Sequence, residues 1–245
     1  MLDSRTRDRI GGISGIVSAL MFAAGWAFWR VPGLPNMSSA IDVSRWFVEH
    51  QNACRVAAIL GSLSLLFMIW FDVCLYGILR KAEGGDGVAT RAFFGGALIS
   101  LAFNMLFCQF LFVVAWRPGR TLPEVTQALN DVFLGPGVAA FGCIMAMFVA
   151  IAVVVIRRGG LPVWLGYSAA AVAAFQVLFI PTSFVYGGIF DISDGLLGVY
   201  VPLGTPVIWT VAASVAMLRR SAAEAYEVSA APRADHRREM VPAEV

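Results

Sequence analysis

The sequence predicts an all-α membrane protein whose six transmembrane helices form one bundle. Of its 245 residues, 59% are hydrophobic and only 14% are charged, and the mean hydropathy is +0.76. A soluble domain of this size needs a more polar surface, so the composition favours a membrane protein. The apolar residues are gathered in long runs, and the basic residues flank these runs unequally. These three observations define the expected fold.

Six apolar runs are long enough to cross about 30 Å of hydrocarbon, which takes roughly 20 residues of helix. Helices are expected because backbone groups in lipid must be hydrogen-bonded within each segment. The runs are Ile10–Trp29, Ala53–Leu79, Ala92–Trp116, Val132–Ile156, Leu161–Phe184 and Leu197–Leu218. We therefore expect residues 1–9 to form an N-terminal tail and residues 10–218 to form the six-helix domain.

The segment between the first two runs predicts a short amphipathic helix. Ser39 and Asp42 have the spacing of a capping box with Asp in place of Glu. Val43, Trp46 and Phe47 fall on one helical face. Such a helix is expected to lie on the lipid headgroups at the external surface.

The chain after the sixth run, residues 219–245, loses its apolar periodicity and is rich in charged residues. This composition predicts a disordered tail.

The basic residues predict the orientation of the bundle. Thirteen flank one set of helix ends: Arg5, Arg7, Arg9, Arg80, Lys81, Arg91, Arg157, Arg158, Arg219, Arg220, Arg233, Arg237 and Arg238. Five flank the other set: Arg30, Arg45, Arg55, Arg117 and Arg120. The positive-inside rule then puts both termini in the cytoplasm. The amino-acid composition is rich in Arg, Ala, Gly and Val, which suggests a GC-rich bacterial genome. We therefore expect a bacterial cytoplasmic membrane.

Asp72 is a carboxyl side chain within the second apolar run, eight residues before Arg80. At about 1.5 Å of rise per residue it lies about 12 Å inside that helix end. An aspartate at a helix centre costs roughly 2.5–3.5 kcal/mol, so it should face the bundle, where burial favours its neutral form. Tyr76 lies one turn further on and can reach it. Hydroxyl side chains of other runs reach a similar depth: Ser18, Ser100, Ser168 and Thr210.

Two interpretations of Asp72 remain open at this point. In the first, the carboxyl binds a ligand or carries a proton. In the second, it is a packing residue that is hydrogen-bonded to hydroxyl groups. A proton relay normally contains a chain of ionisable groups, and the apolar runs show none.

Stripes of small residues are expected to let helices approach closely. The first run carries Gly11, Gly15, Ala19, Ala23 and Ala27 at intervals of four. The third run carries Gly96, Ser100, Asn104 and Cys108 at the same interval.

The external half holds a second polar set. Asn104 and Gln109 lie on the third run, about 140° apart around the helix, and Gln176 lies on the fifth. Asp131 precedes the fourth run and is expected to cap its N-terminus. An ion pair between Arg55 and Asp131 is expected because both lie near the outer boundary.

Prolines and glycines interrupt the external parts of the last helices, at Pro181, Pro202, Pro206, Gly187 and Gly188. Such breaks either line a cavity that opens outward or end helices. The nearby acidic segment, with Asp191 and Asp194, has too few ligands for a calcium loop and predicts a turn.

Two segments resemble an uncharacterised, largely actinobacterial family of multi-pass membrane proteins. They are TQALNDVFLGPG and RRGGLPVWLGYSAA. The resemblance also takes in an external pattern of Trp29, Pro32, Pro35, Trp46, His50 and Arg55. It implies a multi-pass topology, and the family has no assigned chemistry to carry over.

Three classes of function follow. The first is binding, or help in transporting, a small apolar compound or lipid, with Asp72, Tyr76, Ser100, Asn104, Gln109 and Gln176 as candidate ligand-binding residues. The second is an accessory or assembly subunit of a membrane complex, with a homo-oligomer left open. An intramembrane enzyme ranks last, because the sequence lacks hydrolase, nucleotide-binding and metalloprotease motifs. We expect no cofactor, no metal site and no nucleic-acid partner. The protein is expected to be surrounded by a lipid bilayer.

Overall fold

The computed structural model describes residues 3–35, 37–185 and 187–238, apart from the side chains of residues 133–139, 225 and 227–238. Within these ranges the chain is helical and contains no strand. The helices are α1 (Ser4–Arg30), α2 (Ala40–Glu49), α3 (Gln51–Glu83), α4 (Val88–Trp116), α5 (Pro123–Arg158), α6 (Val163–Phe175), α7 (Phe179–Thr182) and α8 (Val201–Arg238). Two short 3₁₀ turns, Gln176–Leu178 and Gly188–Phe190, and one π-helical turn, Leu196–Tyr200, join the last elements.

Six helical segments are long and apolar enough to span a membrane, as the sequence predicts. Many large apolar side chains on their outward faces are exposed, including Leu20, Ile69, Leu98, Val149 and Ile208. An outward apolar surface on every segment fits lipid and does not fit water. The chain is therefore a multi-pass membrane protein of the all-α class.

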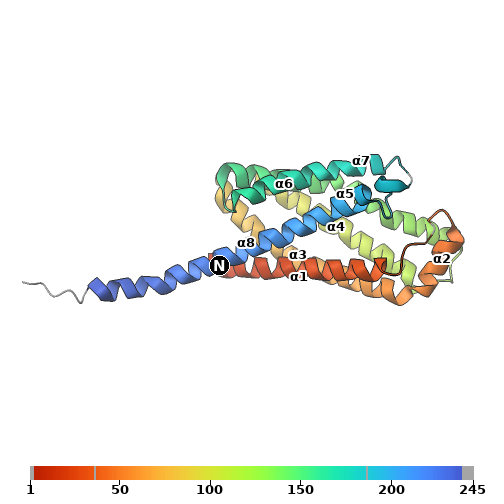
Figure 1. Ribbon diagram of the computed structural model, residues 1–245, viewed down its shortest axis with the longest axis horizontal. Helices are drawn as coiled ribbons and strands as arrows, with labels where there is room; N and C mark the ends of the chain where they lie inside the picture. The colour runs from red at the N-terminus through yellow and green to blue at the C-terminus, as the bar shows by residue number, and fades with distance from the viewer. Residues whose placement is uncertain (1–2, 36, 186, 239–245) are drawn as a thin grey trace, which may run out of the picture.

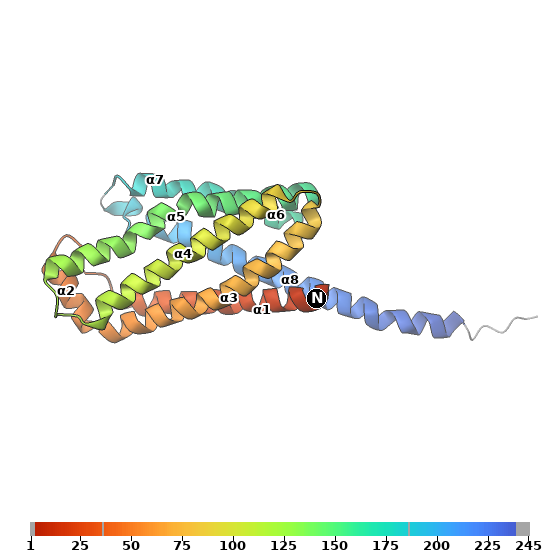
Figure 2. The same cartoon turned by 180° about the vertical axis from the view of Figure 1, so that it is seen from behind.

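The six long segments form a closed ring in the order α1, α3, α4, α5, α6 and α8, with α8 packed back against α1. Figures 1 and 2 show that α8 runs obliquely past α1 and then projects beyond the bundle. Ser4 Oγ donates a hydrogen bond to Glu224 Oε2 at 2.9 Å, so α1 begins where α8 leaves the ring. We call this end the terminal end and the opposite end, which carries α2, the α2 end.

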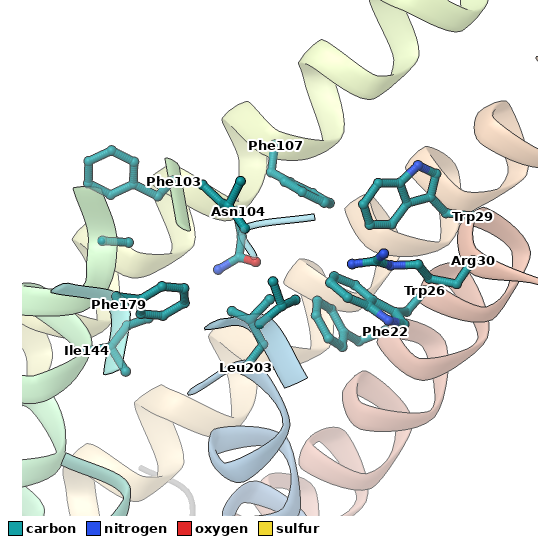
Figure 3. A pocket seen from close by; sticks show the side chains of 13 residues that line it. Phe22, Trp26, Trp29, Arg30, Phe103, Asn104, Phe107, Ile144, Phe179 and Leu203 are labelled. Carbon is teal, nitrogen blue, oxygen red and sulfur yellow. The ribbon is translucent and has the colours of Figure 1, made fainter. Parts of the chain in front are cut away.

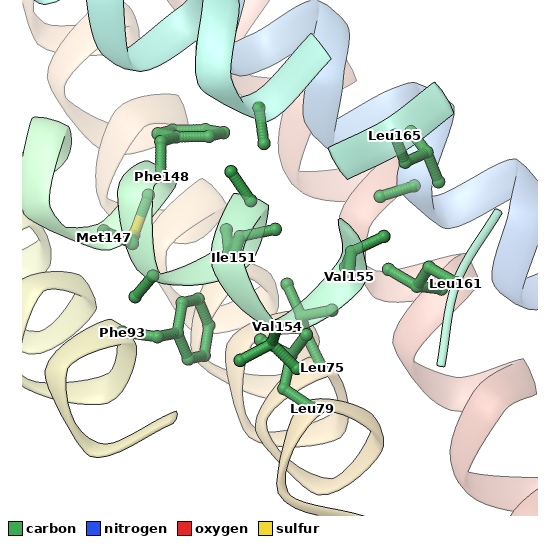
Figure 4. Close-up of a cluster of buried hydrophobic side chains, with 14 of the residues drawn as sticks. Leu75, Leu79, Phe93, Met147, Phe148, Ile151, Val154, Val155, Leu161 and Leu165 are labelled. Carbon is green, nitrogen blue, oxygen red and sulfur yellow. The ribbon is translucent and has the colours of Figure 1, made fainter. Parts of the chain in front are cut away.

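The terminal end is filled by apolar side chains from α3, α4, α5 and α6 (Figure 4). Leu75, Leu79, Phe93, Ile151 and Val155 are completely or almost completely buried there. These side chains fill the interior of the ring between α3, α4, α5 and α6 at this end.

Small residues allow the helices to approach closely, as predicted, but on α1 only along part of the stripe. A Cβ atom at Gly12 would lie 2.8 Å from the Ser214 carbonyl oxygen of α8, and one at Gly96 would lie 2.8 Å from the Cys143 carbonyl oxygen of α5. Gly11 and Gly15 are likewise buried. Ala23 and Ala27 are exposed, so the stripe on α1 ends after Ala19.

The predicted amphipathic helix is α2, and the Ser39 hydroxyl accepts a hydrogen bond from the Asp42 backbone N–H at 3.3 Å. Its apolar face does not lie on headgroups. Val43, Trp46 and Phe47 are buried in a cluster with residues of α1, α3 and α4. The short helix between the first two spans is present as predicted, but its apolar face packs on the bundle and α2 covers this end of it.

Two predicted helix boundaries also differ from those in the structure. α5 begins at Pro123 after Leu122, so Asp131 lies inside the helix and does not cap its N-terminus. α8 continues as helix to Arg238, where a disordered tail was predicted after residue 218. The last residues of that predicted tail, 239–245, lie outside the described part of the chain.

Candidate functional site

A cavity of about 130 Å³ lies inside the ring between α1, α3, α4, α5 and α8, and we call it the inner chamber. Its walls are mainly apolar, with Phe22, Leu65, Met68, Ile144 and Leu203 among them. Its polar lining consists of Asp72, Ser18, Ser64, Ser100, Asn104 and Thr210. Three of the four hydroxyl residues that were predicted at the depth of Asp72 are therefore beside it in the structure.

The Asp72 side chain is 4% exposed and lines the inner chamber. The neighbouring hydroxyl groups are engaged elsewhere, because Ser18 Oγ donates to the Ser64 carbonyl oxygen and Ser100 Oγ donates to the Gly96 carbonyl oxygen. Among the described residues no group donates a hydrogen bond to Asp72, and none forms an ion pair with it. A buried polar group without a partner costs free energy that a ligand can recover by donating to it.

Two predicted neighbours of Asp72 lie elsewhere. The Tyr76 ring contacts the Phe94 ring, with centroids 5.2 Å apart, and it packs against the terminal-end cluster. Ser168 Oγ donates to the Leu165 carbonyl oxygen within its own helix. Tyr76 lies one turn nearer the terminal end than Asp72, within reach of the apolar cluster there. Ser168 lies on α6, which contributes no residue to the lining of the chamber.

A second space, the outer cavity of about 70 Å³, continues from the inner chamber toward the α2 end. The two spaces share Phe22, Asn104, Ile144 and Leu203. Figure 3 shows the Asn104 amide pointing into this space between Phe22, Phe179 and Leu203. Its Nδ2 donates to the Ser100 carbonyl oxygen at 2.9 Å, which orients the amide and leaves its oxygen for a ligand.

An open cleft at the α2 end continues the same path outward, and we call it the external cleft. It shares Arg30 and Ile192 with the outer cavity. Three carboxylates line it: Asp131, Asp191 and Asp194. The irregular backbone near Gly188 and Leu196 lies here, so the predicted breaks do border a cavity that opens at this end.

Gln109 and Gln176 do not line the chamber. The Gln109 side chain is exposed on the outer face of α4. Gln176 is completely buried, and its Nε2 donates to the Pro202 carbonyl oxygen at 2.9 Å. Pro206 has no N–H to bond that carbonyl within α8, so Gln176 replaces the missing donor. Gln176 thereby links the 3₁₀ turn that follows α6 to the first turn of α8.

The predicted ion pair between Arg55 and Asp131 is not formed. Arg55 donates to the carbonyl oxygens of Ala115 and Trp116, both at 3.0 Å, and so caps the C-terminus of α4. Asp131 lies along the external cleft, where burial raises the pKa of its carboxyl and a hydrogen bond from Asn130 opposes the rise. Both residues lie near the α2 end, but on different sides of it.

The turn at Asp191 forms as predicted. Asp191 Oδ1 accepts hydrogen bonds from the Ser193 backbone N–H at 2.6 Å and from the Ser193 hydroxyl. Burial raises the pKa of the Asp191 carboxyl, but these hydrogen bonds outweigh it and the pKa is lowered. Asp191 therefore lines the external cleft as a carboxylate.

One residue of this path was not predicted from the sequence. Arg30 ends α1 and was counted only as a flanking basic residue, yet its guanidinium lies between the outer cavity and the external cleft. Its position after three aromatic residues of the same helix was the available signal, since arginine packs on aromatic faces.

The arrangement can hold a small molecule but shows no set of reactive groups. No cluster of three or more His, Cys, Asp or Glu side chains suited to a metal ion occurs in the described part of the chain. Comparisons with models of known families, with characterised proteins and with solved structures found no match. The resemblance to an actinobacterial family stays a prediction.

Proposed function

We propose that this protein binds a small, mainly apolar compound or lipid in the inner chamber. The observation that carries the proposal is a buried carboxyl group, Asp72, which lines an apolar chamber and has no hydrogen-bond or ion-pair partner among the described residues. Ligand sites of this type combine apolar walls with a few polar groups that fix orientation. Here those groups are Asp72, Ser100 and Asn104.

The chamber supports binding from the α2 end. The outer cavity and the external cleft continue from it in that direction. Toward the terminal end the ring is filled by the buried apolar cluster around Leu75 and Ile151. Release on the second side of a membrane would require this cluster to move, so binding is the primary activity and any role in transport depends on it.

The test measures binding of octan-1-ol to the purified protein in a mild uncharged detergent by isothermal titration calorimetry. Ser100→Leu should fill the chamber and weaken binding about tenfold or more. The matched control, Gln109→Leu, changes an exposed residue of the same helix and should leave binding unchanged. Equal affinity in the wild type and in Ser100→Leu, or no binding at all, would overturn the proposal.

The membrane and orientation are part of the proposal. The unequal flanking charges support a cytoplasmic terminal end and an external α2 end in a bacterial cytoplasmic membrane. The external cleft would then open to the outside of the cell.

A second candidate, an accessory subunit of a membrane complex, is favoured by one observation. Beyond Glu224 the helix α8 projects away from the ring without covering any part of it (Figure 2). An isolated helix of this length is marginal in water and is stabilised by a partner. Truncation after Glu224 should abolish co-purification of a stable partner in mild detergent, and a full-length monomer without any partner would count against this function.

A further inference from the structure

Arg30 lies between the outer cavity and the external cleft and lines both of them. Its guanidinium carbon lies 4.4 Å from the ring centroid of Trp29, 4.9 Å from that of Trp26 and 5.5 Å from that of Tyr200. Figure 3 shows the guanidinium pointing into the pocket between the two indole rings. The aromatic faces orient this cation and partly offset its removal from water.

The hydrogen-bonding capacity of this guanidinium is unused. Nε, Nη1 and Nη2 are all buried, and none of the three has a hydrogen-bond partner among the described residues. A guanidinium carries five N–H donors in a planar fork that matches a carboxylate or a phosphate. Aromatic faces cannot accept all of these donors, whereas an oxygen-rich anion can accept several of them.

The nearby carboxylates do not supply that anion. Asp191 and Asp194 attract the guanidinium through space, but neither forms an ion pair with it within the described ranges. Asp191 already accepts two hydrogen bonds from Ser193. These acids instead line the cleft on the outward side of Arg30.

The space on the inner side of Arg30 is apolar. Phe103, Phe107, Phe179 and Leu203 line it, and it leads to the inner chamber. A molecule with one end on the guanidinium would therefore place the rest of its body among apolar side chains. A positively charged group at this constriction would be repelled by Arg30.

We propose that Arg30 binds the anionic head group, a carboxylate or phosphate monoester, of a small amphiphile whose apolar body occupies the outer cavity and inner chamber. This inference rests on the proposed function, because it names the head group of the compound that the chamber binds. The forked donors bind two oxygens of the head group, and Trp26 and Trp29 hold the fork in place.

The experiment compares three probes of equal chain length: octanoate, octan-1-ol and octylammonium. Each is titrated into the purified full-length protein in uncharged detergent, with isothermal titration calorimetry as the readout. Wild-type protein should bind octanoate at least tenfold more tightly than octan-1-ol, and octylammonium most weakly. Acetate, which has the head group without the chain, should bind far more weakly than octanoate.

Substitutions of Arg30 test whether this residue causes the preference for octanoate over octan-1-ol. Arg30→Gln should weaken octanoate binding about tenfold or more and leave octan-1-ol binding nearly unchanged. Arg30→Lys keeps the charge but loses the fork, so an intermediate loss is expected. The control is Arg45→Gln on α2, since the Arg45 side chain is exposed and pairs with Asp42 at 3.6 Å.

The outcomes separate this inference from the proposed function. If octan-1-ol binds and Ser100→Leu abolishes that binding, but octanoate shows no preference and no dependence on Arg30, the chamber stands and the anion site is wrong. If no probe binds, both are wrong. Should Arg30→Gln fail to fold, the ranking of the three probes on wild-type protein and the Arg30→Lys result still decide the question.

Discussion

Two carboxyl side chains, Asp8 and Asp72, are buried in the bundle with opposite surroundings. Asp8 is 0% exposed and accepts hydrogen bonds from Arg7, 2.8 Å from Nη2. Arg220 Nε lies 3.2 Å from its second oxygen, as an ion pair without hydrogen-bond geometry. Arg220 also donates to the Gly160 carbonyl oxygen, so this cluster ties α8 to α1 and to the loop after α5.

We expect Asp8→Asn to lower the free energy of unfolding by about 3 kcal/mol, because it leaves the two arginines without their shared counter-charge. The value lies at the lower end for a buried pair since both arginines are partly exposed. Denaturant titration in detergent measures it. Asp86→Asn, in an exposed turn, serves as control, and an equal effect of the two substitutions would contradict the assignment.

Asp72 should behave in the opposite way. Replacing it by leucine removes a buried polar group that has no partner among the described residues, so Asp72→Leu should raise the free energy of unfolding by about 1–3 kcal/mol. The same denaturant titration measures it. A loss of stability would show that the carboxyl is hydrogen-bonded in the folded protein.

Asp72→Asn separates the two interpretations that the sequence leaves open. This variant keeps hydrogen-bonding capacity and removes the titrating proton. If its stability and its octan-1-ol binding equal those of the wild type at every pH, neither property depends on the titration of Asp72.

At the scale of helices, close approach depends on a few glycines. Gly96 of α4 faces the α5 backbone, while no atom lies within 4 Å of the Cβ position at Gly95. Gly96→Ala should therefore lower the free energy of unfolding by about 1–3 kcal/mol through overpacking. Gly95→Ala is the matched control and should be neutral or slightly stabilising in a helix. Similar melting temperatures for the two variants would contradict this packing.

Hydropathy predicted the six spans because lipid imposes a minimum length on each helix. It did not predict what the apolar face of α2 contacts, because Val43 and Phe47 are equally suited to lipid and to a protein neighbour. It also misplaced the start of α5: residues 123–131 are polar enough to suggest a loop, yet they are helical and pack near α2.

For the molecule as a whole, the predicted orientation can be tested with two substitutions. Val31→Cys places an exposed side chain at the α2 end, just after α1, and Asp86→Cys lies in a turn at the terminal end. A membrane-impermeant maleimide applied to intact cells should label the first variant and not the second. The reverse pattern would contradict the positive-inside assignment. Of the four native cysteines, Cys54, Cys74 and Cys108 are buried and Cys143 is partly exposed, so the protein without an added cysteine is labelled in parallel to measure the background.

The sequence predicted how deep the site residues lie along their helices, but not the direction in which their side chains point. Counting residues from helix ends grouped Ser18, Ser100 and Thr210 with Asp72, because rise per residue is constant in a helix. The same count could not tell that Ser168 and Gln109 point away, since the rotation of each helix depends on its neighbours. The role of Arg30 was not predicted, because it depends on Tyr200, which is far away in the sequence.

Closure of the ring by α8 against α1 also has a consequence for biosynthesis. During translation α1 is made before α8, so the glycine face of α1 contacts Ser214 and Met217 only after α8 has been made. Until then the chamber lacks the wall that Leu203 and Thr210 provide. A chain in which only the first five of these spans have been made therefore has no complete chamber, because the chamber wall on α8 is still missing.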